Sequence, residues 1–218
     1  MLKILKVLIS IILIINTILF TISFSISFTI IFRPFYYWHI THLKIDENSN
    51  YSYEEIKKAY DDVMDYCIYN KKFKTGNLNY SEAGKNHFKD CKKLFIINFI
   101  ILGLSTITMI LKLYLFKSIK ILGFNPSFYS SCIILAILIF ISIIVLNIGF
   151  EELFTKSHSI IFYNKDNWIF DPKTDEIIKI LPLNYFRNCG ILIVSIISTI
   201  SITNIIKEII IKKRKSIA

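Results

Sequence analysis

Four long stretches of the chain contain no charged residue. They cover residues 7–32, 94–111, 121–150 and 188–206. Each is close to or longer than the roughly 20 apolar residues that a helix needs to cross a hydrocarbon core about 30 Å thick. We therefore expect four transmembrane helices, at about 7–32, 94–116, 128–150 and 188–208, within a single polytopic membrane domain that covers residues 1–218.

Composition agrees with a membrane protein. Apolar residues make up 54% of the chain and charged residues only 19%, whereas soluble domains average about 25% charged residues. The first apolar stretch follows two lysines, as in a signal peptide, but it is much longer than a signal-peptide core and no small-residue cleavage pattern follows it. We expect this segment to be retained as a span.

The charges outside the spans divide unevenly between the two sides of the membrane. Four crossings place both termini and the loop 112–129 on one side, and the loops 33–93 and 151–187 on the other. The first side has ten basic residues and one acidic residue, whereas the second has 16 basic and 15 acidic residues. By the positive-inside rule, the termini are cytoplasmic and both long loops face outward. The net charge of +10 is thus explained by topology and does not call for a nucleic-acid partner.

The first outer loop carries helix signals. Arg33 and Pro34 end the first span, because proline lacks an amide donor and disfavours helix in the residue before it. Ser52 and Glu55 form a capping box at the start of an amphipathic helix over 52–69. We expect a second helix to begin near Tyr80 and to run into the second span.

The second outer loop carries strand signals. Residues 159–163 are rich in β-formers, 164–167 read as a turn, and 168–170 resume an extended pattern, which predicts a β-hairpin. A third short strand is expected over 176–181. The predicted fold class is an all-α integral membrane protein with four transmembrane helices and a small α+β extracytoplasmic cap.

The chain has four histidines, and the predicted topology puts all of them on the outer side: His39, His42, His87 and His158. Three or four imidazoles can bind zinc, but a His-x2-His pair is a weak metal signal. Histidine also suits proton transfer near neutral pH. Asp90 stands three residues after His87, so on a helix its carboxylate lies on the same face and can orient the imidazole.

Other outer residues suit contact with a lipid headgroup. Arg33 is at headgroup depth, where it can bind a phosphate or an ester carbonyl or simply anchor the helix. Tyr36, Tyr37 and Trp168 can contact a ligand, but their positions fit an interfacial aromatic belt better. Two functional classes remain open on these residues: a histidine-dependent membrane enzyme, or a non-enzymatic membrane protein whose histidine-rich outer surface binds a partner or zinc.

Five segments of the outer loops form a more specific pattern. They read RPFYY at 33–37, YSYEEI at 51–56, HFKDCK at 87–92, HSIIFYN at 158–164 and WIFDP at 168–172. In this order, between four spans, they resemble the lipoprotein intramolecular transacylase (Lit) family of low-GC Gram-positive bacteria. The resemblance covers nearly the whole chain.

The resemblance implies an activity and its requirements. Members of this family move the sn-2 acyl chain of a diacylglyceryl-cysteine lipoprotein to the α-amine of that cysteine, giving the lyso-form lipoprotein. The implied partners are a diacylated lipoprotein substrate and membrane lipid, with no nucleic acid, cofactor or metal. The implied location is the cell membrane, with the active site on the extracytoplasmic side, and we expect a monomer.

The resemblance also assigns residues. The two histidines that the family is presumed to use in catalysis correspond to His87 and His158. We expect His158 to act as general base and His87, oriented by Asp90, as acid or oxyanion partner, with the opposite assignment still open. The remaining expected contacts are with the substrate, and these involve Arg33, Tyr36, Tyr37 and Trp168.

Overall fold

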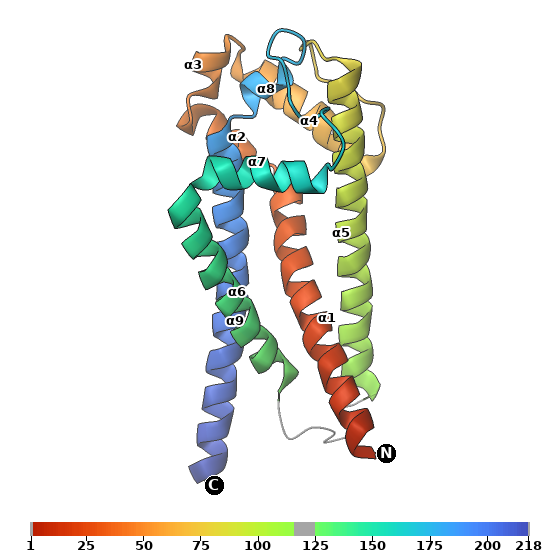
Figure 1. The fold of residues 1–218 in the computed structure, drawn as a ribbon, viewed down its shortest axis with the longest axis vertical. Coiled ribbons are helices and arrows are strands. Elements are labelled where there is room, and N and C mark those ends of the chain that lie inside the picture. Colours follow the sequence, from red (N-terminus) through yellow and green to blue (C-terminus); the bar gives the residue numbers. More distant parts are fainter. Residues whose placement is uncertain (1, 116–124, 218) are drawn as a thin grey trace. The chain divides into compact units, whose positions relative to one another are not determined.

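The computed structural model describes residues 2–115 and 125–217, and within these ranges the chain is helical with no strand. The helices (Figure 1) are α1 Leu2–Ile31, α2 Pro34–His42, α3 Ile45–Ser49, α4 Tyr53–Tyr69, α5 Glu82–Leu115, α6 Pro126–Ile148, α7 Phe150–Ile161, α8 Ile177–Ile180 and α9 Leu183–Ile217.

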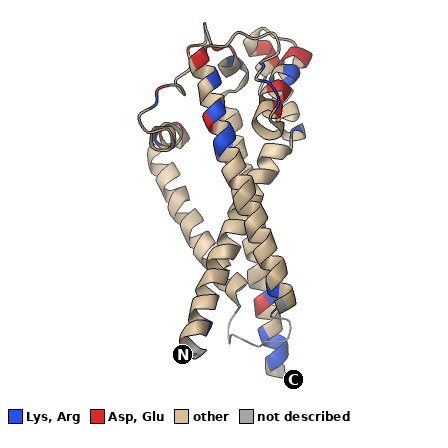
Figure 2. Cartoon of the chain, turned by 90° about the vertical axis from the view of Figure 1, so that its right-hand side faces the viewer, with Lys and Arg blue, Asp and Glu red and all other residues tan. Residues whose placement is uncertain are grey.

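Four of these helices, α1, α5, α6 and α9, are long and apolar enough to cross a membrane. Their large apolar side chains are mostly exposed, as suits a surface that faces lipid rather than water. Figure 2 shows the long middle parts of these helices free of charged residues. The protein is a multi-pass membrane protein, and the four predicted spans are confirmed. Part of the predicted loop 112–129 lies outside the described residues.

The described chain forms two compact units. The span unit consists of residues from Met1–Phe28, Asn98–Ile144 and Leu192–Ala218, and the cap unit consists of Thr29–Ile97 and Val145–Ile191. Each unit is described by itself below.

In the span unit, α1 is buried along its small hydroxyl residues. Ser10, Thr17, Thr21 and Ser25 are buried, and Thr17 and Thr21 each donate a hydrogen bond to the carbonyl four residues earlier. Small residues let helix backbones approach closely where lipid tails provide no hydrophobic force between helices. Amide side chains add contacts between helices: Asn98 donates to Ser27 Oγ at 2.7 Å.

The core of the cap unit is built on α4. The capping box of Ser52 and Glu55 is formed as predicted, and it starts a helix whose apolar face is buried. Tyr36 of α2 stacks on Tyr60 of α4, with ring centroids 3.7 Å apart and ring planes within 12° of parallel. The predicted helices at 52–69 and from near Tyr80 are confirmed as α4 and the start of α5.

The predicted β-hairpin and third strand are wrong. Residues 159–161 continue α7, residues 168–170 form turn and coil, and residues 177–180 form α8. Glu151 and Glu152 in the first turn of α7 stabilise a helix N-terminus, so the β-branched residues at its end simply prolong the helix. In α8, Ile177 and Ile180 are both buried at a spacing of three, which is a helical period.

Gly149 separates α6 from α7. Its φ of +81° is a backbone conformation that residues with a side chain rarely adopt. The chain can therefore change direction within one residue, and α7 starts at Phe150. α7 carries His158 in its last two turns and buries none of its own residues.

Candidate active site

Two histidines that are 71 positions apart in sequence meet in the cap unit. His87 lies in the second turn of α5 and His158 near the end of α7, and their ring centroids are 6.4 Å apart with the planes inclined by 32°. Both rings also contact Phe162, the residue that ends α7. The structure therefore brings together the pair expected to be catalytic.

His87 is buried, with 6% of its surface exposed. Aromatic rings surround it, with the centroids of Phe162 and Phe170 at 4.8 Å and 5.3 Å. Its Nε2 contacts the thiol of Cys91, one helical turn along α5, at 3.3 Å. Its Nδ1 is buried and has no hydrogen-bond partner among residues 2–115 and 125–217. A buried polar atom left unpaired costs about 1–3 kcal/mol, so this nitrogen marks a place for a ligand atom.

His158 is half-buried, and within the described residues its Nδ1, unlike that of His87, has a protein partner. Its Nδ1 lies 2.9 Å from the carbonyl oxygen of Phe154, which can only accept a hydrogen bond. The proton of the neutral ring is therefore on Nδ1, and Nε2 carries the lone pair. Trp168, one of the expected substrate contacts, lies beside it with ring centroids 5.6 Å apart.

Asp90 has partners other than His87. Its carboxylate accepts hydrogen bonds from Lys165 at 2.7 Å and from the side-chain amide of Asn167 at 3.2 Å, and Lys93 lies 3.4 Å away. No hydrogen bond joins it to His87 in the described chain. Asp90 thus connects the segment after α7 to α5.

An open cleft lies at these contacts and is lined by Asn86, Lys89 and Asp166, among others.

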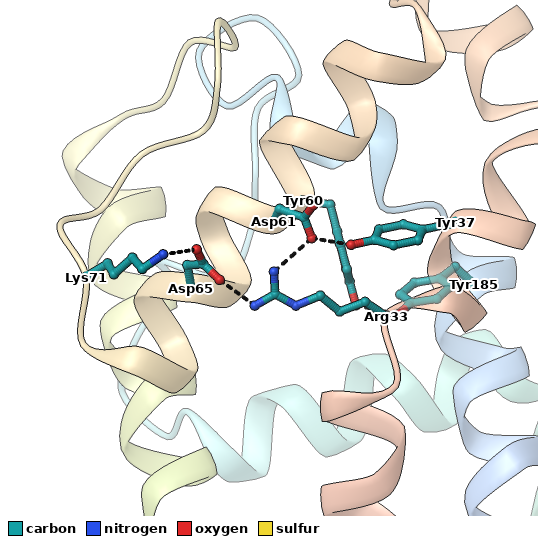
Figure 3. A network of polar contacts seen from close by, with 7 residues as sticks. All are labelled: Arg33, Tyr37, Tyr60, Asp61, Asp65, Lys71 and Tyr185. Atoms are coloured by element: carbon teal, nitrogen blue, oxygen red, sulfur yellow. Dashed lines mark hydrogen bonds and ion pairs between the residues drawn. The ribbon is translucent and has the colours of Figure 1, made fainter.

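Arg33 and Tyr37 belong to a separate polar network (Figure 3). The Arg33 guanidinium binds Asp61 at 2.9 Å and also Asp65, and the Tyr37 hydroxyl donates to Asp61 at 2.6 Å. Burial and the hydrogen bond to Asp61 raise the pKa of Tyr37 to about 12. Lys71 also binds Asp65, and its hydrogen bond, together with Arg33, lowers the pKa of that carboxyl group. The network joins the start of α2 to α4.

Tyr36 is a core residue. It is fully buried, and its hydroxyl donates to the carbonyl oxygen of Ile180 at 2.7 Å. Its ring contacts the rings of Tyr60 and Tyr185, whose hydroxyls lie 3.2 Å apart. Of the four expected substrate contacts, the structure places only Trp168 beside the histidine pair, and Arg33, Tyr36 and Tyr37 between α2 and α4.

The other two histidines have local partners. His39 is buried, its Nδ1 donates to the carbonyl oxygen of Phe35 at 2.6 Å, and its Nε2 accepts from Asn188 at 2.8 Å. Burial lowers the pKa of His39 below its usual 6.5. His42 is exposed and stacks on Trp38. Where the structure describes the chain, no group of three or more His, Cys, Asp or Glu residues is placed to hold a metal ion.

Sequence reasoning missed the surroundings of the histidine pair. The four cysteines are free, and the contact of Cys91 with His87 was not foreseen, although their spacing of four on one helix gives the signal for it. The rings of Phe154, Phe162 and Phe170 were also missed. Phe162 and Phe170 lie in the segments predicted as strands, 159–163 and 168–170, and Phe154 lies before them in α7.

A family model described as lipoprotein intramolecular transacylase Lit matches residues 11–186 of the chain. A comparison with curated proteins found no match. Among solved structures, the integral membrane transacylase Lit from Bacillus cereus is similar, with a TM-score of 0.84, 24% sequence identity, and coverage of 98% of this chain and 99% of that one.

Two further structures of the Bacillus cereus protein carry a replaced histidine. The variant with arginine has a TM-score of 0.77 and 23% identity, and covers 97% of this chain and 95% of its own. The variant with alanine has a TM-score of 0.72 and 24% identity, with coverages of 98% and 96%. At these identities the likeness shows a shared fold.

Proposed function

Because the chain belongs to the lipoprotein intramolecular transacylase (Lit) family, we propose that it transfers the sn-2 acyl chain of a diacylglyceryl-cysteine lipoprotein to the α-amine of the same cysteine. The protein is then an integral membrane acyltransferase that modifies lipoproteins and yields the lyso-form. From the charge distribution we place the reaction on the extracytoplasmic side, with both termini in the cytoplasm, and in a monomer.

One observation carries the proposal: two imidazoles contact the same aromatic ring, Phe162, and among residues 2–115 and 125–217 they keep different nitrogens free of protein partners. His158 has its Nε2 lone pair available, and the buried Nδ1 of His87 has no partner in the described chain. A lone pair suits a general base, and a nitrogen that carries a proton suits a hydrogen-bond donor to a developing oxyanion.

His158 is the general base of the first step. The attacking α-amine must be neutral, and with a pKa near 7.7–8.0 it is in this form in a fraction of the substrate molecules at pH 7. The amine nitrogen attacks the sn-2 ester carbonyl carbon, a C–N bond forms, and the proton that leaves nitrogen goes to Nε2 of His158. His87 donates a hydrogen bond to the carbonyl oxygen as it becomes negative.

The second step returns the proton. The C–O bond to the sn-2 oxygen breaks, the carbonyl re-forms as an amide, and the His158 imidazolium protonates the departing oxygen to a hydroxyl. Atoms and charge balance without a nucleotide or acyl carrier. Because ester and amine belong to one molecule, holding them in attack geometry supplies much of the rate enhancement. The phenylalanine rings around His87 exclude water that would hydrolyse the ester.

The other expected residues act around this pair. Trp168 contacts the substrate beside His158, and Asp90 positions the segment that carries Trp168 through its bonds to Lys165 and Asn167. Arg33, Tyr36 and Tyr37 act through the scaffold, because their polar groups already bind α4 or Ile180.

The test uses a bacterial host that lacks this activity and whose lipoproteins keep a diacylglyceryl group and a free α-amine. The host expresses the chain, His87→Ala, His158→Ala, or His42→Ala as the matched control. Substrate and product have the same mass, so tandem mass spectrometry must locate the acyl chain on nitrogen or on glycerol. We expect the lyso-form with the unaltered chain and His42→Ala only. Lyso-form from either active-site variant removes that histidine from the chemistry.

A further inference from the structure

Cys91 contacts His87 from one turn further along α5. Its sulfur lies 3.3 Å from Nε2 of His87, within the distance of a hydrogen bond to sulfur. A spacing of four residues on a helix keeps the two side chains on one face. Asp90, the neighbouring residue, is bound to Lys165 and Asn167 instead. Within the described chain, Cys91 is therefore the side chain that fixes a nitrogen of this ring.

The chemistry of the two groups sets the direction of this hydrogen bond. A thiol sulfur is a poor acceptor, whereas the unprotonated nitrogen of a neutral imidazole is a good one. The thiol therefore donates its proton to Nε2. A neutral imidazole has one proton and one lone pair, so the ring proton of His87 is on Nδ1.

The surroundings of Nδ1 indicate what this tautomer can do. Nδ1 is buried among aromatic rings with no partner in residues 2–115 and 125–217. A protonated Nδ1 there is a donor kept for an oxygen atom of a ligand. His158 shows the complementary arrangement, since the carbonyl of Phe154 occupies its Nδ1 and leaves Nε2 as an acceptor.

We propose that Cys91 is a positioning residue, whose thiol proton holds Nε2 of His87 as an acceptor so that Nδ1–H is directed to the ester oxygen of the substrate. This role rests on the function proposed above, because it assigns the donor to His87 and the base to His158. Cys91 forms no bond with the substrate and takes no part in proton transfer.

The decisive measurement is the tautomer of His87 in the whole purified protein. Histidine is labelled with ¹⁵N, the His87 signals are assigned by their loss in His87→Gln, and the ring-nitrogen shifts are compared in the unaltered chain, Cys91→Ala and Cys91→Ser. We expect a protonated Nδ1 in the unaltered chain and in Cys91→Ser, whose hydroxyl also donates. Cys91→Ala should shift the population toward a protonated Nε2.

Rates provide the second readout. Single-turnover acyl transfer should fall about tenfold in Cys91→Ala and recover most of the way in Cys91→Ser. Cys132→Ala, an exposed cysteine of α6, is the matched control and should transfer at the normal rate. A normal rate in Cys91→Ala, or a tautomer that it leaves unchanged, overturns the proposal.

The two proposals fail in different ways. A protonated Nε2 in the unaltered chain refutes the role of Cys91 even if transfer needs His87. Lyso-form made by His87→Ala refutes the role of His87 in the reaction, whatever its tautomer. If Cys91→Ala does not fold, the S–H stretching band of the unaltered chain still decides. The band of Cys91 is the one that disappears in Cys91→Ser. A shift of this band to lower frequency supports donation, and the frequency of a free thiol contradicts it.

Discussion

His39 of α2 and His87 of α5 differ in the hydrogen bonding of their ring nitrogens, although both are buried. His39 is 1% exposed and His87 is 6% exposed, so both lie in the interior of the cap unit. Each ring nitrogen of His39 has a protein partner, Phe35 or Asn188, whereas Nδ1 of His87 has none in the described chain. A buried imidazole with every nitrogen bonded holds a fold together, and one with a nitrogen left over is prepared for a ligand.

The largest effect should come from His158→Ala. Losing the general base should slow single-turnover acyl transfer by about 10³-fold, since such groups contribute 10²–10⁴-fold. Thermal unfolding should change little, because α7 buries none of its own residues. Imidazole added to the solution should restore part of the rate by filling the space left by the side chain. An unchanged rate would place the base elsewhere.

Arg33→Gln tests whether the polar network between α2 and α4 stabilises the fold and leaves substrate binding unchanged. It leaves Asp61 and Asp65 without their shared cation, so the free energy of unfolding should fall by about 1–3 kcal/mol. Chemical denaturation of the protein in detergent measures this. The transfer rate and the KM for lipoprotein should stay normal while the chain is folded. A raised KM without loss of stability would instead make Arg33 a substrate contact.

Acidification tests the two buried histidines of the cap unit, because burial lowers the pKa of His39 and lowers that of His87 to about 4. The folded-state pKa of His39 is lowered from 6.5 by burial, so the unfolded chain binds a proton at a higher pH than the folded chain does. The free energy of unfolding should therefore decrease as the pH falls below 6.5 and through the folded-state value. His39→Gln should reduce this pH dependence and leave the part that His87 contributes, whereas the exposed His42→Gln should preserve it in full. Equal slopes in all three proteins would contradict the prediction.

The smallest effect is expected from Asp90→Asn. The bond to Lys165 is partly solvent-exposed, and such ion pairs contribute about 0–1 kcal/mol. Acyl transfer should slow by less than about fivefold, with Trp168 less well held beside His158. A decrease in the transfer rate as large as that of His158→Ala would indicate that Asp90 acts directly on one of the two histidines.

Local sequence signals predicted the four long helices and α4, but not α2, α3, α7 or α8. The spans follow from charge-free length, and α4 follows from the capping box at Ser52 and Glu55, because each signal acts within one element. The hairpin failed since the β-branched residues after His158 belong to a helix that begins at Phe150. The strand propensity of five residues does not outweigh the cooperative extension of a helix that has already formed.

Of the candidate site residues, the structure brings together His87, His158 and Trp168. The resemblance to a family selected His87 and His158, but no local pattern reveals that Arg33 binds carboxylates 28 and 32 positions away on α4. Tyr36 and Tyr37 were expected to contact the substrate, and their actual partners, Ile180 and Asp61, could not be foreseen for the same reason. Partners that come from distant elements are set by tertiary packing, whereas the pairing of Cys91 with His87 depends on helical spacing alone.

Gly149 affects the orientation of the helix that follows it. Any residue with a Cβ would strain the positive φ between α6 and α7 and push the following helix into a new direction. The imidazole nine positions later would then be aimed differently. A side chain at position 149 should therefore change the candidate active site, although Gly149 contributes no reactive group.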